Sequence, residues 1–246
     1  AGHIWKFITL AYIPPTIAGI VLAYRGKLLA GGILTAFFIA LQIMSNHVQM
    51  SYYFLFVILF IAGAYFEDAW RNKTLPRFFK ASAVLLVAAL IGVAANLSNL
   101  YHTYTYSKET MRGKSELVQT GDAAKQTSSG LDRDYITNWS YGIGETWTLL
   151  VPNFKGGSSS APLSQSEAAM EKANPMYGSL YNSLPQYFGS QPWTAGPVYV
   201  GAFVLFLFVL GCFIVKGPLK WALLGATFFS IVLAWGKNFM PLTDFF

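Results

Sequence analysis

The sequence predicts an all-α membrane protein with about six transmembrane helices and one long extracytoplasmic insert between helices four and five. Hydrophobic residues make up 54% of the chain and charged residues 11%, whereas a soluble domain carries roughly 25% charged residues. A spanning helix needs about 20 mostly apolar residues. Six apolar segments approach that length: residues 7–24, 28–45, 50–66, 78–97, 197–215 and 218–235.

These segments divide the chain into three parts. Residues 1–97 hold four helices, residues 98–196 form the insert, and residues 197–246 hold two more helices. Pro14-Pro15 lies inside the first segment, where we expect a kink or a late helix start. The chain begins with Ala1-Gly2-His3, without an initiator Met, and stops at Asp244-Phe245-Phe246, so we expect it to be part of a longer protein.

Basic residues in the short loops predict the orientation. Three alternate loops fall on one side of the membrane and contain eight basic residues against two acidic ones: Arg25, Lys27, Arg71, Lys73, Arg77, Lys80, Lys216 and Lys220 against Glu67 and Asp68. The insert instead contains seven basic and eight acidic residues. Positive loops stay inside, so the insert is expected outside. The net charge of +6 therefore reflects topology, and we expect no nucleic-acid partner.

The predicted helices have no ionisable residue at their centres. Such a residue costs about 2.5–3.5 kcal/mol on the insertion scale, and pumps and ion-coupled transporters normally contain one. The sequence therefore disfavours both. The single cysteine, Cys212, lies in an apolar run, which excludes an internal disulfide and indicates a packing or lipid-facing role.

Four stretches of the insert suggest local structure. Residues 101–106 alternate aromatic and polar side chains, which fits a short strand or an aromatic belt at the membrane surface. Residues 107–126 fit an amphipathic helix, and residues 155–166 fit a flexible loop. Residues 166–174 have helix-forming composition, and Asn174-Pro175 would end that helix.

Asp132-Arg133-Asp134 is the first of three candidate sites. Two carboxylates at this spacing can share a divalent cation such as Mg²⁺ or Mn²⁺ with a diphosphate, because both cations prefer oxygen ligands. The alternative is a pair of turn caps with Arg133 as a local counter-charge.

Glu145 is the second candidate, as a catalytic base in the segment Tyr141-Gly-Ile-Gly-Glu-Thr-Trp147. The two glycines allow a ligand to approach closely, and Trp147 offers an aromatic face for a sugar. The alternative is a carboxylate that is favoured at the N-terminus of a helix by the helix dipole.

The turn between the second and third segments is the third candidate. It places Asn46, His47 and Gln49 beside Tyr52 at the membrane boundary, where they could bind a phosphate or sugar headgroup. The alternative is a solvated turn with interfacial tyrosines.

Three stretches resemble the bacterial YfhO family. They are residues 131–157, which run from Leu-Asp-Arg-Asp-Tyr to Asn-Phe-Lys-Gly-Gly; the turn Ser-Asn-His-Val-Gln-Met-Ser-Tyr-Tyr at 45–53; and Gln-Pro-Trp-Thr-Ala-Gly-Pro-Val-Tyr at 191–199. The resemblance extends over essentially the whole chain. That family is similar to the GT-C glycosyltransferases, which are multi-pass membrane enzymes.

The resemblance implies a membrane glycosyltransferase that works on the outer face of the bacterial cytoplasmic membrane. The donor would be a polyprenyl-phosphate-linked sugar and the acceptor an envelope glycan or lipid. Asn46, His47 and Gln49 would contact the donor phosphate, while Asp132, Asp134 and Glu145 would line the acceptor side. The alternative function is non-enzymatic: a flippase for lipid-linked glycans or an envelope-assembly scaffold.

The predicted orientation can be tested by cysteine labelling. In a Cys212→Ser background, Ser158→Cys in the insert should react with a membrane-impermeant maleimide added to intact cells, whereas Asn72→Cys in a basic loop should react only after the membrane is opened. Labelling of Asn72→Cys alone in intact cells would reverse the topology.

Overall fold

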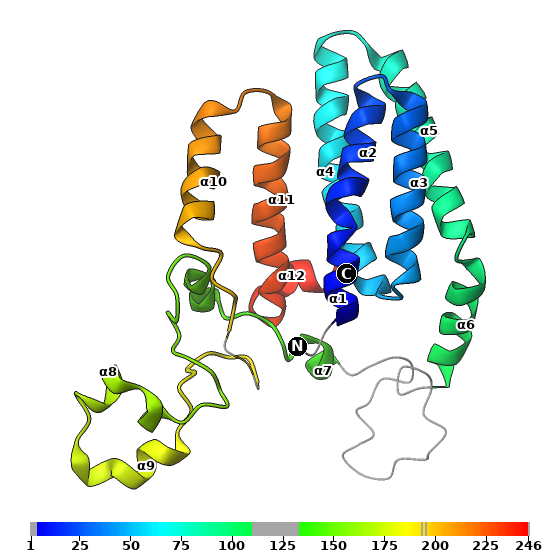
Figure 1. Ribbon diagram of the computed structural model, residues 1–246. Coiled ribbons are helices and arrows are strands. Elements are labelled where there is room, and N and C mark those ends of the chain that lie inside the picture. The colour runs from blue at the N-terminus through cyan, green and yellow to red at the C-terminus, as the bar shows by residue number, and fades with distance from the viewer. Residues whose placement is uncertain (1–3, 110–132, 193, 195, 246) are drawn as a thin grey trace. The chain divides into compact units, whose positions relative to one another are not determined.

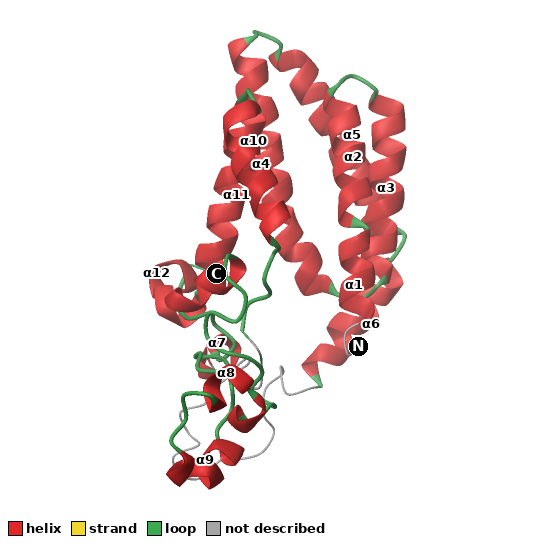
Figure 2. Ribbon diagram, turned by 60° about the vertical axis from the view of Figure 1, so that its left-hand side comes forward, coloured by secondary structure: helices red, strands yellow, loops and turns green. Residues whose placement is uncertain are grey.

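The computed structural model describes residues 4–109, 133–192, 194 and 196–245. Within these ranges the chain is helical and contains no strand, as the sequence predicts (Figure 2). Two isolated β-bridges, Gly156 to Tyr187 and Pro162 to Pro185, are the only extended pairings in the part described.

Two compact units make up the chain. The first unit contains residues 1–130 and 216–226, and the second contains residues 131–215 and 227–246. The helices of the first unit are α1 (Ile4–Ala11), α2 (Ile13–Tyr24), α3 (Leu28–Met44), α4 (Val48–Arg71), α5 (Leu75–Ala94) and α6 (Leu97–Lys108) (Figure 1). Helix α11 (Pro218–Ala234) begins in the first unit and ends in the second.

Short helices dominate the second unit. In chain order they are α7 (Arg133–Thr137), the 3₁₀ helices η2 (Ile143–Leu149) and η3 (Leu163–Gln165), α8 (Glu167–Met170), η4 (Pro175–Tyr177), α9 (Gly178–Ser183), α10 (Ala202–Ile214), η5 (Gly236–Phe239) and α12 (Met240–Thr243).

Three helical stretches are long and apolar enough to cross a membrane: residues 4–24, α4 and α5. Helix α11 with the stretch Gly236–Thr243 passes the same test as a pair bent by 112°. The remaining two apolar helices, α3 and α10, have 17 and 13 residues. An all-helical membrane protein is thus indicated, and the count of six spans stays a prediction.

The proline pair acts as a helix start. Helix α1 ends at Ala11, and α2 begins at Ile13 with proline in its first turn. A first-turn residue has no intrahelical acceptor for its N–H, so proline loses little there. The helix is thus interrupted at Tyr12, just before the prolines, and does not start late, because α1 already covers Ile4–Ala11; the two helices together form one 21-residue apolar stretch.

Helices α2 and α3 pack with their backbones in close contact. A Cβ atom added to Gly31 would lie 2.5 Å from the Ala23 nitrogen and 2.6 Å from the Gly19 carbonyl oxygen. One added to Gly19 would lie 2.5 Å from Thr35 Oγ1. Small residues allow such an approach between helices in lipid, where apolar burial gives little driving force.

Helix α5 packs on the neighbouring side of α3. A Cβ atom at Gly92 would lie 2.8 Å from the Ala36 carbonyl oxygen. Just past the end of α5, Asn96 donates from Nδ2 to the Ala40 carbonyl oxygen at 2.9 Å. The buried side chains Ile20 and Ile61, with Ala23 and Leu85, complete the apolar core between these helices and α4.

The first unit exposes many large apolar side chains on α4 and α5. Leu59 and Leu86 are 57% and 63% exposed. Contiguous apolar surface of this kind is rare on soluble monomers and is expected where lipid is the solvent.

Two expectations for the insert need correction. Residues 101–106 lie within α6, so the alternative of a short strand is wrong. Helix α6 ends at Lys108, and residues 110–126 of the expected amphipathic helix lie outside the described part. The helix expected at 166–174 is shorter, because α8 covers only Glu167–Met170.

The α2–α3 contact predicts an unequal effect of two glycine substitutions. Gly31→Ala should destabilise the first unit by about 1–3 kcal/mol, because the added methyl group meets backbone on two sides. Gly63→Ala on α4 has no atom within 4 Å of the new Cβ and should be neutral or stabilising. Thermal unfolding in detergent measures both; equal effects would contradict the packing.

Candidate functional site

The turn between α3 and α4 holds the candidate residues of the first unit. Asn46 has a φ of 55°, a conformation that asparagine tolerates better than most residues. Its side chain is exposed and accepts a hydrogen bond from Thr103 Oγ1 of α6 at 3.3 Å. His47 is the N-cap residue of α4, and Gln49 is exposed in the first turn of that helix.

Several side chains around this turn are polar and buried. Thr9 of α1 and Ser45 are joined by a hydrogen bond between their hydroxyl groups, and Ser45 also donates to the Gln42 carbonyl oxygen at 2.6 Å. Gln42 Nε2, His47 Nδ1 and Ser51 Oγ are buried without a hydrogen-bond partner among the described residues. Each such atom loses about 1–3 kcal/mol of hydration, so these three groups are suited to a polar ligand.

A cavity of about 610 Å³ opens beside Asn46. Ligand pockets typically enclose about 300–1,000 Å³. Donors, acceptors and an aromatic ring line it: Asn46, His102, Thr103, Thr105, Tyr106 and Glu109. Tyr52 is 47% exposed on α4, and its ring contacts those of Tyr53 and Phe56 with centroids 5.7 and 5.3 Å apart.

The candidate cation site is only partly described. Asp132 lies outside the described residues, and Asp134 is exposed in the first turn of α7. Among the residues that the structure describes, no group of three His, Cys, Asp or Glu could hold a metal ion. The expected use of a cation by Asp132 and Asp134 stays a prediction.

Glu145 is the centre of the second unit. Its side chain is 1% exposed, although it carries a carboxylate. The backbone N–H of Gly142 donates to Oε2 at 2.8 Å, while the Tyr187 hydroxyl and the Ser190 N–H both donate to Oε1. Three donors replace the water lost on burial, so the carboxylate links the start of η2 to residues 187–190.

Tyr187 is also connected, through Gln191, to the segment that contains Trp139. Its hydroxyl accepts a hydrogen bond from the Gln191 N–H at 3.2 Å, and Gln191 Nε2 donates to the Trp139 carbonyl oxygen. Burial, together with the bond to Glu145, raises the pKa of Tyr187 to about 12. Burial and the charge of Glu145 also raise the pKa of Tyr141.

Glycine is required where these segments meet. A Cβ atom at Gly189 would lie 1.8 Å from Glu145 Oε1 and 2.0 Å from the Tyr187 hydroxyl. The backbone therefore approaches the carboxylate more closely than any side chain permits.

Residues 235–237 also form hydrogen bonds with the segment around Glu145. Trp235 donates from Nε1 to Thr146 Oγ1 at 2.8 Å, and the Lys237 N–H donates to Ser140 Oγ at 2.9 Å. Trp147, on the same 3₁₀ helix as Glu145, is 55% exposed and packs near Phe154 with ring centroids 6.4 Å apart.

The structure therefore brings some predicted residues together. Asn46 shares a cavity with residues of α6, and Glu145 lies with Trp147 on η2. The alternative for Glu145 is also realised, because it is the third residue of η2 and accepts from the N-cap backbone. One shared site for Glu145 and the Asn46-His47 turn stays a prediction, because these residues belong to different units.

Sequence reasoning missed the partners of both centres. Tyr187 and Ser190 lie more than 40 residues after Glu145, and Thr103 lies 57 residues after Asn46. The close glycines before Glu145 and the Tyr187-Phe-Gly-Ser190 sequence were the only local signals of a tight contact.

Comparisons of the chain with protein-family models, with curated proteins and with solved structures gave no significant match.

Tyr187→Phe should destabilise the second unit by about 1–3 kcal/mol, because the Gln191 N–H loses its acceptor and Glu145 loses one of its donors. Tyr177→Phe, an exposed tyrosine, is the control and should be neutral. Limited proteolysis measures the difference in stability: the second unit should be cleaved faster in Tyr187→Phe than in Tyr177→Phe.

The loss of stability caused by Tyr187→Phe should also depend on pH. The pKa of Tyr187 is about 12 in the folded chain and about 10 when unfolded, so its contribution is fully present below pH 10 and is lost as the pH rises towards 12. The stability difference between the wild type and Tyr187→Phe should shrink across that window. A constant difference would place the hydroxyl outside the network.

Proposed function

We propose that this chain is part of a GT-C-like membrane glycosyltransferase, which transfers a sugar from a polyprenyl-phosphate donor to an envelope glycan or lipid. The reaction would take place on the outer face of a bacterial cytoplasmic membrane, with residues 98–196 on that side. The chain would cross the membrane six times in this topology.

The polar turn after α3 is the main support for this proposal. A cavity of about 610 Å³ opens beside Asn46. Polar atoms of Gln42, His47 and Ser51, which do not line that cavity, are buried close to Asn46 in the sequence and lack a partner among the described residues. The amide and the imidazole can donate hydrogen bonds, and the hydroxyl can donate or accept. A phosphate or the hydroxyl groups of a sugar would satisfy such a set.

The position of this turn also supports a lipid-linked substrate. It follows an apolar helix, α3, and precedes α4, which is long enough to span a membrane. A polyprenyl chain requires apolar surroundings, whereas its phosphate requires polar ones at the membrane boundary. In this proposal Asn46, His47 and Gln49 contact the phosphate, and Tyr52 packs near the sugar.

The acceptor side would be formed by the second unit. Trp147 exposes an aromatic face beside Glu145, and Asp132 and Asp134 would carry a divalent cation that neutralises the leaving phosphate. For Glu145 to act as the base, the carboxylate would have to exchange one of its three donors for the acceptor hydroxyl.

The state of Glu145 favours a second candidate function. A carboxylate that is 1% exposed and held by three donors is well suited to organise loops. This observation fits a non-enzymatic flippase or assembly scaffold, in which the second unit only shapes a path for a lipid-linked glycan.

Sugar transfer in membrane vesicles tests the proposal. With radiolabelled polyprenyl-phosphate sugars as donors, His47→Ala and Asn46→Gly should each reduce transfer about 10- to 100-fold, the loss expected for one hydrogen bond to a charged group. Glycine at position 46 keeps the left-handed backbone and removes only the amide.

Lys73→Gly is the matched control, because Lys73 also has a φ of 55° and lies at the other end of α4. Transfer should be unchanged in that variant. Labelled lipid that crosses the membrane without sugar transfer, in the wild type, would support the flippase and contradict the enzyme.

A further inference from the structure

A groove with an apolar lining runs along the first unit between α3 and α5. Its volume is about 480 Å³. Small residues spaced one turn apart form its floor: Gly32, Ala36 and Ala40 on α3, with Ala88 and Gly92 on α5. Larger side chains, among them Leu29 and Ile91, form its edges and are 77% and 58% exposed.

The two helices run in the same direction, and each begins at the same end of the groove. Helix α2 joins α3 through a tight turn at Gly26, and a Cβ atom there would lie 3.7 Å from Arg77 Nη2 of α5. The first turns of α3 and α5 are therefore neighbours. Both N-termini direct the positive ends of their helix dipoles towards this mouth of the groove.

Basic side chains surround the same mouth. Lys27 is the N-cap residue of α3. On α5, Arg77 and Lys80 precede the groove residue Val84 by seven and four positions, so they lie on the helix face that lines the groove. All three side chains are exposed.

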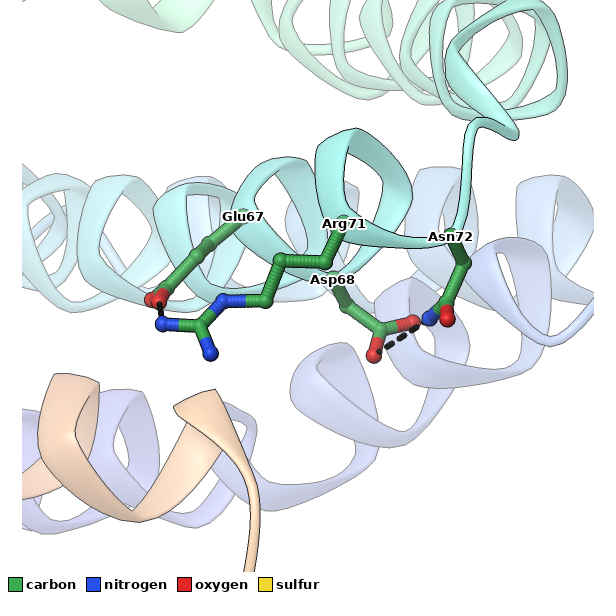
Figure 3. Close-up of polar contacts among 4 residues, drawn as sticks. All are labelled: Glu67, Asp68, Arg71 and Asn72. Atoms are coloured by element: carbon green, nitrogen blue, oxygen red, sulfur yellow. Dashed lines mark hydrogen bonds and ion pairs between the residues drawn. The ribbon is translucent and has the colours of Figure 1, made fainter.

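The carboxylates near the end of α4 are bonded to residues at that end of α4 and not to this cluster. Glu67 pairs with Arg71 on α4, and Asp68 accepts a hydrogen bond from Asn72 Nδ2 at 3.1 Å (Figure 3). Among the described residues, no ion pair joins a carboxylate to Lys27, Arg77 or Lys80, so these three side chains are available to an external anion.

We propose that this groove binds one anionic phospholipid, with an acyl chain between α3 and α5 and the phosphate against Lys27, Arg77 and Lys80. The charge identifies the occupant, because a neutral lipid or a second apolar helix would leave the basic mouth unmatched. Basic pockets at the ends of membrane helices recognise such headgroups. This site is at the opposite end of α3 from the Asn46 turn and does not depend on the proposed transferase function.

Native mass spectrometry of the detergent-purified chain tests this site, with phosphatidylglycerol and phosphatidylcholine as probes. The wild type should retain one phosphatidylglycerol in preference to phosphatidylcholine. Arg77→Gln with Lys80→Gln should weaken phosphatidylglycerol binding about 25-fold, since each basic group at a membrane surface contributes a factor of about five. Ala36→Leu, which fills the groove, should weaken both lipids.

The control is Arg71→Gln with Lys73→Gln, which removes the same charge from the end of α4 and should leave binding unchanged. Equal retention of the two lipids by the wild type, or equal losses in the two double variants, would overturn the proposal. A dimer that Ala36→Leu dissociates would also overturn it, since the groove would then be an interface between copies.

Discussion

Close contact between helix backbones is the constraint on which the first unit depends. Gly19, Gly31 and Gly92 leave no room for a Cβ atom, so α2 and α5 can approach α3 on two sides. In lipid this contact replaces the hydrophobic effect as the source of helix association. It also fixes α3, and α3 carries both the polar turn at its C-terminal end and the apolar groove along its length.

In the second unit, the buried carboxylate of Glu145 connects the segments, whereas small residues do so in the first unit. A lone carboxylate loses several kcal/mol of hydration on burial unless donors replace the water. Glu145 has three such donors, drawn from segments more than 40 residues apart. Burial, together with the hydrogen bond to Glu145, raises the pKa of Tyr187, so its phenol stays neutral and keeps donating to the carboxylate.

Local signals predicted the fold well and the sites less well. The six apolar segments overlap α1 to α5, α10 and α11, and the proline pair marks the break before α2. Alternation at residues 101–106 left a strand open as one alternative, because six residues with period two also fit a surface helix; there Thr105 Oγ1 donates to the Tyr101 carbonyl oxygen, one helical turn earlier. The partner of Glu145 could not be predicted, since a hydrogen bond between distant segments leaves no spacing in the sequence.

Glu145 and the turn after α3 differ in whether their polar atoms already have hydrogen-bond partners within the protein. Glu145 accepts its three hydrogen bonds from residues of the second unit, and its burial leaves no face for a substrate without rearrangement. Gln42, His47 and Ser51 are the reverse case, because buried polar atoms of these side chains lack partners in the described structure. Unsatisfied buried groups are rare in folded proteins, so these three atoms are the ones that a ligand of the proposed site would satisfy. In the proposed function, binding chemistry therefore lies at the turn after α3, and the stretch around Glu145 is the scaffold that shapes the second unit.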